Sequence, residues 1–307
     1  MKGTKRLICT RPSWQSSNRL VQNLHLEAFC KENGIEYVNP TFADMAYRYV
    51  QPCHIDKIKS PIGLLIFIFR ALRKIRTFLK LPTEPDLINR YFSKVGLKYI
   101  LFDDTHARHD YEKILHDIFY KHNTVIVEGF FFRVPWLTNK YQDEMSRKYS
   151  LKSKFFENNN LYKKIVVLKQ LENILIAVHI RRGDYSWWRG GKFYFEDDVY
   201  KKYMSDLSQK IAETSQKQQF FIIFSNDIVK FDLAANIILS KECWFIDQHL
   251  MSMCDYIIGP PSTFSAWANY MGKNKLYHIL DASGKIDTAS SSSVEFIPIN
   301  KPCGETR

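Results

Sequence analysis

Residues 174–185 read ILIAVHIRRGDY, an apolar run of strand type that passes directly into a charged turn. From this point towards the C-terminus, strand patterns alternate with helical patterns. The strand patterns are 174–180, 220–224, 244–246, 256–258 and 276–280, and the helical patterns are 197–214, 229–239, 247–254 and 262–271. A repeating strand and helix series predicts a parallel sheet with right-handed crossovers, which is a Rossmann-like α/β fold.

The first half of the chain has the same kind of pattern, less regularly spaced. Strand patterns at 6–10, 35–38, 97–102 and 124–127 accompany helical patterns at 19–32 and 110–121. A chain of 307 residues has room for two domains of ordinary size. We therefore expect an N-terminal α/β domain over 1–165, a C-terminal Rossmann-like domain over 166–287 and a tail over 288–307.

Polar side chains follow the predicted strands of the second half. Parallel α/β sheets bind ligands outside the carboxyl ends of their strands, so these residues are candidates for a binding site. They are His179 at the end of the first strand, Arg181, Arg182 and Asp184 after it, Asp227 after the second, Asp247 after the third, and Ser262, Thr263, Phe264 and Ser265 after the fourth. The pattern predicts that one sheet edge gathers all of them.

The residue types point to a nucleotide diphosphate. Arg181 and Arg182 are costly at a buried strand end unless they pair with carboxylates or phosphates, which suit the planar guanidinium group. Ser262 and Thr263 can cap a helix whose first turn offers N–H groups to phosphate. An ionised Asp247 accepts hydrogen bonds only, which suits the N1–H and the amine of guanine.

Simpler structural roles stay open for three of these residues. Arg182 can form a structural bridge to Asp184, His179 can be a core histidine, and Ser262 can be an N-cap alone. Convergence of all of them on one edge favours the binding site.

The catalytic base has two candidates. Glu128 follows the strand 124–127 of the acceptor-side domain, and Asp184 lies in the charged turn. Either carboxylate can accept a proton from a substrate hydroxyl. The structural alternatives are that Glu128 caps a loop and that Asp184 orients Arg182.

The net charge of +12 is concentrated in one segment. Residues 57–80 hold seven basic and no acidic side chains. The excess positive charge on the rest of the chain is therefore small, which argues against nucleic acid as a partner. The segment fits either a basic amphipathic helix on the surface of an anionic membrane or a core helix with a charged outer face.

Metal, disulfide and secretion signals are missing from the sequence pattern. The six cysteines form no CxxC pair, and the adjacent pairs Asp103-Asp104 and Asp197-Asp198 lack DxD spacing. The apolar stretch at the N-terminus stops too early for a signal peptide. We expect an enzyme without metal or other cofactor, located in the cytoplasm or peripherally on the inner face of the membrane.

An aromatic and glycine-containing segment follows the charged turn. Trp187 and Trp188, together with the aromatic run 193–195, flank the sequence Arg-Gly-Gly-Lys at 189–192. The segment fits either a mobile flap that stacks on the face of a sugar or aromatic packing between the domains.

Three motifs resemble those of fucosyltransferases of the α-1,2 type, glycosyltransferase family eleven, and of the related α-1,6 and protein O-fucosyl groups. They are HIRRGDY at 179–185, FSND at 224–227 and DQHLMSMCDYIIGPPSTFSAW at 247–267. The resemblance implies a GT-B architecture, two Rossmann-like domains facing a central cleft. It also implies inverting, metal-independent transfer from GDP-fucose to a glycan hydroxyl.

The resemblance also implies roles for single residues. Arg181 holds the donor β-phosphate and stabilises the departing GDP, His179 and Asp247 contact the nucleoside, and 262–265 contact the phosphates. Family members carry a G-x-G-N-Q turn after the first strand; here only Asn18 matches it, without the glycines. Pro260 and Pro261 stand where many members have an asparagine.

The leading hypothesis is therefore fucose transfer to a glycan in surface polysaccharide synthesis. A lipid-linked acceptor would account for a membrane contact through 57–80. The alternatives are a glycosyltransferase that uses another nucleotide sugar, and a non-catalytic basic protein that binds membranes or nucleic acid.

Overall fold

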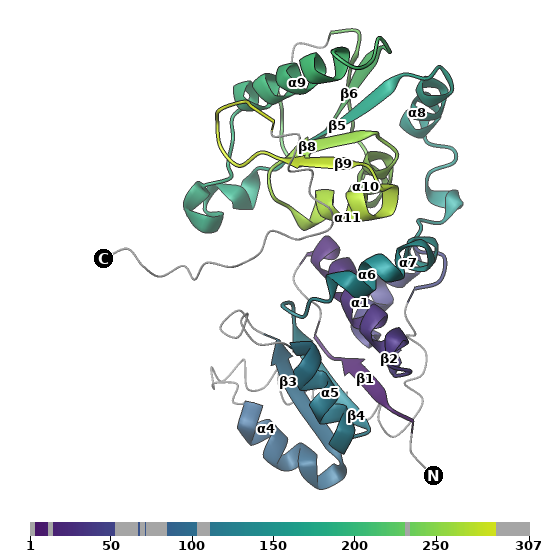
Figure 1. Cartoon of the computed structure of the whole chain (residues 1–307), viewed down its shortest axis with the longest axis vertical. Coiled ribbons are helices and arrows are strands. Elements are labelled where there is room, and N and C mark those ends of the chain that lie inside the picture. Colours follow the sequence, from purple (N-terminus) through teal and green to yellow (C-terminus); the bar gives the residue numbers. More distant parts are fainter. Residues whose placement is uncertain are drawn as a thin grey trace. The chain divides into compact units, whose positions relative to one another are not determined.

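The computed structural model describes residues 4–11, 15–52, 67, 71, 85–102, 111–230 and 234–286 (Figure 1). These residues divide between two compact units, an N-terminal unit within 1–150 and a C-terminal unit within 151–298. Most of the basic segment 57–80, the pair Asp103-Asp104 and the tail 288–307 lie outside the described residues.

The N-terminal unit is built on a four-stranded parallel sheet in the order β2-β1-β4-β3. Its strands are β1 (Arg6–Cys9), β2 (Glu36–Val38), β3 (Leu97–Phe102) and β4 (Thr124–Gly129). Its described helices are α1 (Ser16–Glu32), α2 (Ala43–Ala46), α4 (Pro85–Phe92), α5 (Tyr111–Lys121), α6 (Pro135–Lys140) and α7 (Gln142–Lys148). The four strands predicted from the sequence are all present.

The C-terminal unit is built on a five-stranded parallel sheet in the order β7-β6-β5-β8-β9. Its strands are β5 (Ile174–Ile180), β6 (Gln219–Ser225), β7 (Ile237–Leu239), β8 (Tyr256–Gly259) and β9 (Lys275–His278). Its α-helices are α8 (Asn160–Gln170), α9 (Asp197–Ala212), α10 (Trp244–Ser252) and α11 (Thr263–Gly272). Two Rossmann-like units, as in GT-B enzymes, confirm the predicted α/β fold class.

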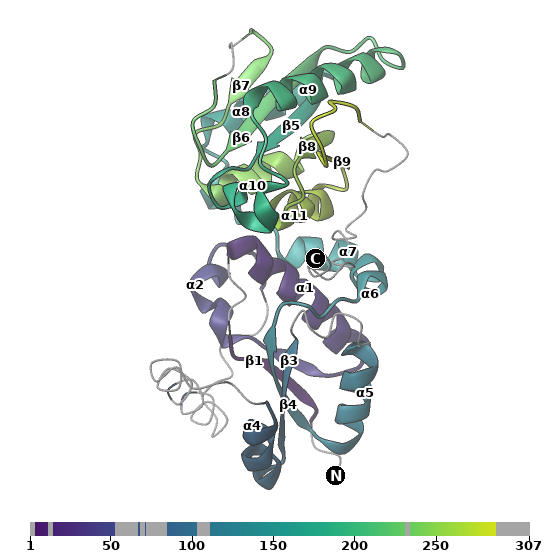
Figure 2. The ribbon, with the colours of Figure 1, turned by 90° about the vertical axis from the view of Figure 1, so that its left-hand side faces the viewer.

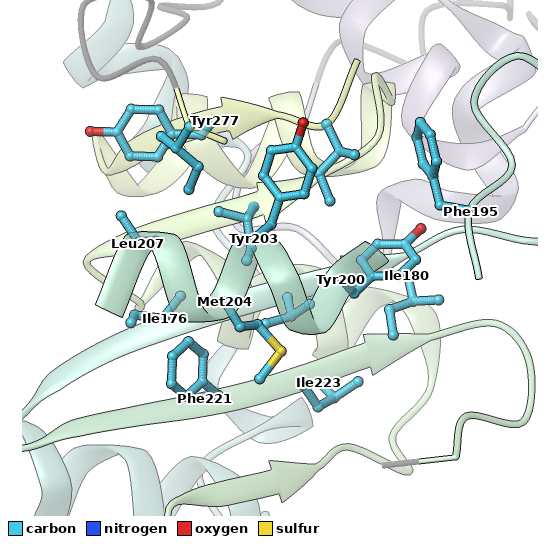
Figure 3. Packing of buried hydrophobic residues seen from close by; sticks show 14 of the residues in the cluster. Ile176, Ile180, Phe195, Tyr200, Tyr203, Met204, Leu207, Phe221, Ile223 and Tyr277 are labelled. Carbon is cyan, nitrogen blue, oxygen red and sulfur yellow. The ribbon is translucent and has the colours of Figure 1, made fainter. Parts of the chain in front are cut away.

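Strand β5 lies in the middle of its sheet and is buried on both faces, which explains its unbroken apolar run. On one face Ile176 and Ile180 pack beneath α9, whose Tyr200, Met204 and Leu207 complete the core (Figure 3). The other face packs against α8, α10 and α11. Figures 1 and 2 show α9 on the opposite side of the sheet from α10 and α11. This double packing holds the carboxyl end of β5 in place.

Two secondary-structure predictions in this unit are wrong. Residues 229–239 were predicted as a helix. The described residues 229–230 and 234–236 are not helical, and 237–239 form the edge strand β7, because Ile237, Ile238 and Leu239 pair with β6. Residues 244–246, predicted as a strand, form the first turn of α10. Short apolar runs fit either structure by periodicity, and the sheet edge beside β6 is already taken by β7.

The division between the units lies before the domain boundary predicted at residue 165. Helix α8 spans that boundary, and its Ile165 and Leu168 pack into the C-terminal core beneath β5. Residues from Leu151 onward therefore belong with the C-terminal unit.

Candidate functional site

The carboxyl ends of four parallel strands lie at one edge of the C-terminal sheet. The strand register places Ile180 opposite Ser225, Val178 opposite Ile258, and Gly259 opposite His278. Residues that follow these positions therefore share one edge, as expected for the ligand site of a parallel α/β sheet.

His179 lies at this edge against the start of α11. Its ring stacks on Phe264 with 5.1 Å between ring centroids, and the side chain is buried. Burial lowers the pKa of His179 to about 3, and the nearby charge of Arg181 adds to the effect. Its Nδ1 atom has no hydrogen-bond partner. The imidazole is thus neutral, and its buried Nδ1 atom is one of the polar atoms without a partner.

Gly259 allows β8 to approach β5 closely behind His179. A Cβ atom at position 259 would lie 2.6 Å from the His179 carbonyl oxygen and 2.9 Å from its Cβ atom. Only glycine fits this contact.

The start of α11 is capped as the sequence predicts. The Ser262 hydroxyl accepts a hydrogen bond from the Phe264 backbone N–H at 3.2 Å, and the Ser265 hydroxyl donates to the Ser262 carbonyl at 3.1 Å. Thr263 occupies the first helical position, and Ser265 is fully buried. The positive end of the α11 dipole therefore lies at the sheet edge, where it favours an anion.

Arg181 is linked to α11 through Tyr185. Its guanidinium carbon lies 5.6 Å from the centre of the Tyr185 ring, and the Tyr185 hydroxyl donates to the Pro261 carbonyl. Burial raises the pKa of Tyr185 to about 12, and a hydrogen bond with Ser262 acts against that rise. The arginine and the helix N-terminus thus converge on one buried tyrosine.

Asp184 forms an ion pair with Arg181, with 2.8 Å between Oδ1 and Nη2. The structural alternative considered above, in which Asp184 bridges to or orients Arg182, is therefore wrong. The carboxylate side chain keeps 32% of its surface exposed, so it remains reachable from solvent.

Arg182 is bound within the protein. Its guanidinium group pairs with Asp197 in the first turn of α9 and donates to the Ile228 carbonyl at 3.1 Å. Its backbone N–H donates to the Asn226 side chain at 2.9 Å. Arg182 is buried and ties the turn after β5 to the turn after β6. Asp197 compensates the charge of Arg182. The expectation that Arg182 would instead pair with a diphosphate is therefore not supported by its contacts.

Asp247 lies on α10 and not at the end of a strand, but it still reaches the same edge. Its carboxylate accepts a hydrogen bond from Ser240, whose N–H binds the Ile223 carbonyl near the end of β6. The next residue, Gln248, donates to the Phe264 carbonyl at 3.2 Å. Burial raises the pKa of Asp247 to about 7, against the lowering effect of the Ser240 hydrogen bond.

Asp227 and the two candidates in the N-terminal unit lie in other surroundings. Asp227 is exposed after β6, and its carboxylate accepts from the Ile228 N–H at 2.7 Å. Asn18 is in the first turn of α1. Glu128, on β4, is 1% exposed and accepts hydrogen bonds from Thr10 at 2.8 Å and Tyr99 at 3.3 Å. Glu128 thus links Thr10, the residue after β1, to Tyr99 on β3.

Comparison with known proteins gives the family. The sequence model of glycosyl transferase family 11 matches residues 105–288, more than half of the chain. The chain belongs to this family. The membership predicted from its motifs is thereby confirmed, and the protein is a glycosyltransferase. No curated protein sequence matches the chain.

Solved structures of low sequence identity share the fold of this family 11 protein. A mutant of Arabidopsis thaliana FUT1 in complex with GDP has 12% identity and a TM-score of 0.53, over 90% of this chain and 70% of that chain. The fucosyltransferase NodZ from Bradyrhizobium has 13% identity and a TM-score of 0.51, over 90% and 95%. NodZ α-1,6-fucosyltransferase soaked with GDP-fucose has 12% identity and a TM-score of 0.50, over the same shares.

Two residues at this sheet edge were not among the candidates predicted from the sequence. Tyr185 lies inside the HIRRGDY motif, but its bridging role depends on contacts with Arg181 and Pro261. His278 ends β9 beside Gly259, and burial lowers its pKa to about 4. The strand predicted at 276–280 placed His278 inside the strand, whereas β9 ends at this residue.

Within the part of the chain that the structure describes, no group of three or more His, Cys, Asp and Glu side chains is arranged to hold a metal ion. None of its helices has both the length and the apolar character needed to cross a bilayer.

Proposed function

We propose that this family 11 glycosyltransferase transfers fucose from GDP-fucose to a glycan hydroxyl, with inversion at the sugar C1 atom, without a metal ion, and with an α-1,2 linkage. The observation that carries the proposal is the convergence of Arg181 and the N-terminus of α11 on Tyr185. GDP and GDP-fucose in solved structures of the same fold support a guanosine diphosphate donor.

The diphosphate is the group that this edge would hold. Arg181 and the first turn of α11 both present positive charge there. As the acceptor oxygen forms its bond to C1, the bond from C1 to the β-phosphate oxygen breaks, and its electron pair leaves with GDP. The growing negative charge on GDP is stabilised by Arg181 and the helix dipole, in place of a metal ion.

Asp184 is the better of the two proposed bases. Attack on the face opposite GDP requires an acceptor for the hydroxyl proton. Asp184 adjoins Arg181 and is partly exposed, whereas Glu128 is almost fully buried and engaged by two hydroxyl groups. When the diphosphate engages Arg181, the Asp184 carboxylate is released from its ion pair to take the proton.

Asp247 and His179 would bind the nucleoside. An ionised Asp247 accepts from the N1–H and the amine of guanine. Both residues lie near Phe264. The His179 ring stacks on the Phe264 ring, and Gln248, which follows Asp247, donates to the Phe264 carbonyl. Asn18 and Asp227 stay proposed donor contacts from the family motifs, and Arg182 is proposed to position the turn that carries Arg181.

Calorimetry with GDP and GDP-fucose tests the donor assignment on the intact protein. We expect saturable binding, a loss of at least tenfold in affinity for Arg181→Ala, and partial retention for Arg181→Lys. Arg90→Ala, at an exposed position on α4, is the matched control and should bind like the unaltered protein. Absence of binding, tighter binding of a different nucleotide sugar, or an unchanged affinity for Arg181→Ala would refute the assignment.

We also propose a lipid-linked acceptor and a peripheral, cytoplasmic-side location. The support is the basic and apolar sequence of 57–80. Deletion of this segment should lower turnover of a vesicle-bound acceptor and spare turnover of a soluble one. Equal loss with both acceptors would contradict the membrane role.

A further inference from the structure

The turn that follows Arg181 is closed on itself by backbone and side-chain hydrogen bonds. The Ser186 hydroxyl donates to the Gly183 carbonyl at 2.7 Å, the Trp187 N–H to the Asp184 carbonyl at 3.3 Å, and the Gly190 N–H to the Trp187 carbonyl at 3.1 Å. Arg189 has a φ of 51°, which is uncommon outside glycine. The chain thus accepts a strained residue to keep this turn compact.

Two of the aromatic side chains in the turn anchor it to the core of the C-terminal unit. Tyr185 is buried, and the Trp188 ring lies 4.8 Å from it and 5.7 Å from the Phe193 ring. These contacts lie within one unit. They hold the backbone of the turn in place against the core of the C-terminal unit.

Trp187 has the opposite orientation. Its side chain is 71% exposed, and among the described residues its ring makes no aromatic contact or hydrogen bond. A single exposed aromatic residue is common on protein surfaces. What distinguishes Trp187 is the place of its backbone in the chain: its N–H donates to the backbone carbonyl of Asp184, whose carboxylate pairs with Arg181.

The proposed reaction requires a sugar ring at this place. The acceptor hydroxyl must reach C1 of the donor, so the acceptor ring must lie within a few ångströms of the residues that hold the diphosphate. Pyranose rings present apolar C–H faces that pack on aromatic side chains, and the indole N–H can donate to a ring hydroxyl. An exposed indole three residues after Asp184 in the same turn can supply both contacts.

We propose that Trp187 forms the acceptor subsite, in which the indole stacks on the face of the pyranose ring that carries the accepting hydroxyl. This inference rests on the proposed function and deepens it, because it assigns a residue that binds the acceptor. The hydrogen-bonded turn fixes the backbone of Trp187, so little backbone freedom is lost there when the glycan binds.

Steady-state kinetics with GDP-fucose and a soluble galactose-terminated oligosaccharide test the subsite. Trp187→Ala should raise the acceptor KM by about tenfold, the scale of one aromatic contact. The Kd for GDP-fucose and the slow hydrolysis of GDP-fucose without acceptor should stay within twofold of the unaltered protein. Trp187→Phe should restore most of the acceptor KM.

The control is Tyr120→Ala, because Tyr120 is an 88% exposed aromatic residue on α5. This variant should leave the acceptor KM and the Kd for GDP-fucose unchanged. An unchanged acceptor KM in Trp187→Ala, or an equal rise in the Kd for GDP-fucose, overturns the subsite. Failure of the unaltered protein to bind GDP-fucose refutes the proposed function instead, so the two failures are distinguishable.

Discussion

Asp184 pairs with Arg181 across 2.8 Å, while the next arginine along the chain, Arg182, pairs with Asp197 at the start of α9. Two adjacent guanidinium groups thus have separate surroundings. The Arg181 side chain keeps 18% of its surface exposed and the Arg182 side chain 8%. The first stays partly exposed, and the second holds two turns together.

Asp184→Asn should separate catalysis from donor binding. Loss of the proposed base should lower kcat by about a hundredfold. The Kd for GDP should change by less than threefold, because Arg181 keeps its charge. Asp198→Asn is the control, since Asp198 is 84% exposed and pairs with Lys201 on the surface of α9. A large loss of GDP affinity with unchanged kcat would show that Asp184 only orients Arg181.

Arg182→Ala should destabilise the C-terminal unit. Removal of one partner of a buried ion pair leaves Asp197 uncompensated, which costs about 3 kcal/mol or more of unfolding free energy. Lys201→Ala, which breaks an exposed pair, should cost less than about 1 kcal/mol. Urea denaturation followed by circular dichroism measures both. Equal costs for the two variants would be incompatible with a structural role for Arg182.

The raised pKa of Asp247 predicts that donor binding depends on pH. Its pKa of about 7 means that it is largely protonated at pH 6, when it no longer accepts both guanine hydrogen bonds. GDP affinity should fall by about tenfold from pH 8 to pH 6 in the unaltered protein. In Asp247→Asn the affinity should be low throughout and the slope much smaller. The neutral His179 and His278, with pKa values of about 3 and about 4, do not titrate in this range.

The same carboxyl group makes a prediction for stability. Its folded-state pKa lies above the ordinary value of 3.8, so the folded chain holds a proton that the unfolded chain has lost. The contribution of Asp247 to stability is therefore complete below about pH 4 and is lost as the pH rises to about 7. Thermal unfolding of the unaltered protein and Asp247→Asn between these values should show this loss only in the former.

Gly259→Ala should disturb the site from behind His179. The added Cβ atom meets the backbone of β5, and overpacking of this kind costs about 1 to 3 kcal/mol. Displacement of His179 from Phe264 should also weaken GDP binding. Gly34→Ala is the comparison, because position 34 has open space and only its φ of 60° is unfavourable to alanine. Unchanged GDP affinity in Gly259→Ala would argue against a donor pocket at this edge.

Much of the site was predictable because its residues follow strands. The apolar run 174–180 is a central strand, the end of β8 leads into a capped helix, and His179 and Ser262 lie where the pattern places them. Asp247 also reaches the expected edge, although the short run before it forms a helix and not a strand.

The sequence by itself determined the alternation of strands and helices, and with it the sheet edge at which polar side chains gather, because side-chain periodicity is a local property of the chain. Only the tertiary structure decided which carboxylate each arginine meets, that Glu128 is enclosed by hydroxyl groups, and that Trp187 faces solvent while Trp188 is packed. Such choices depend on distances between elements far apart in the sequence, such as Arg182 and α9 or Tyr185 and Pro261. No local pattern encodes those distances; they follow from the packing of the helices on the sheet.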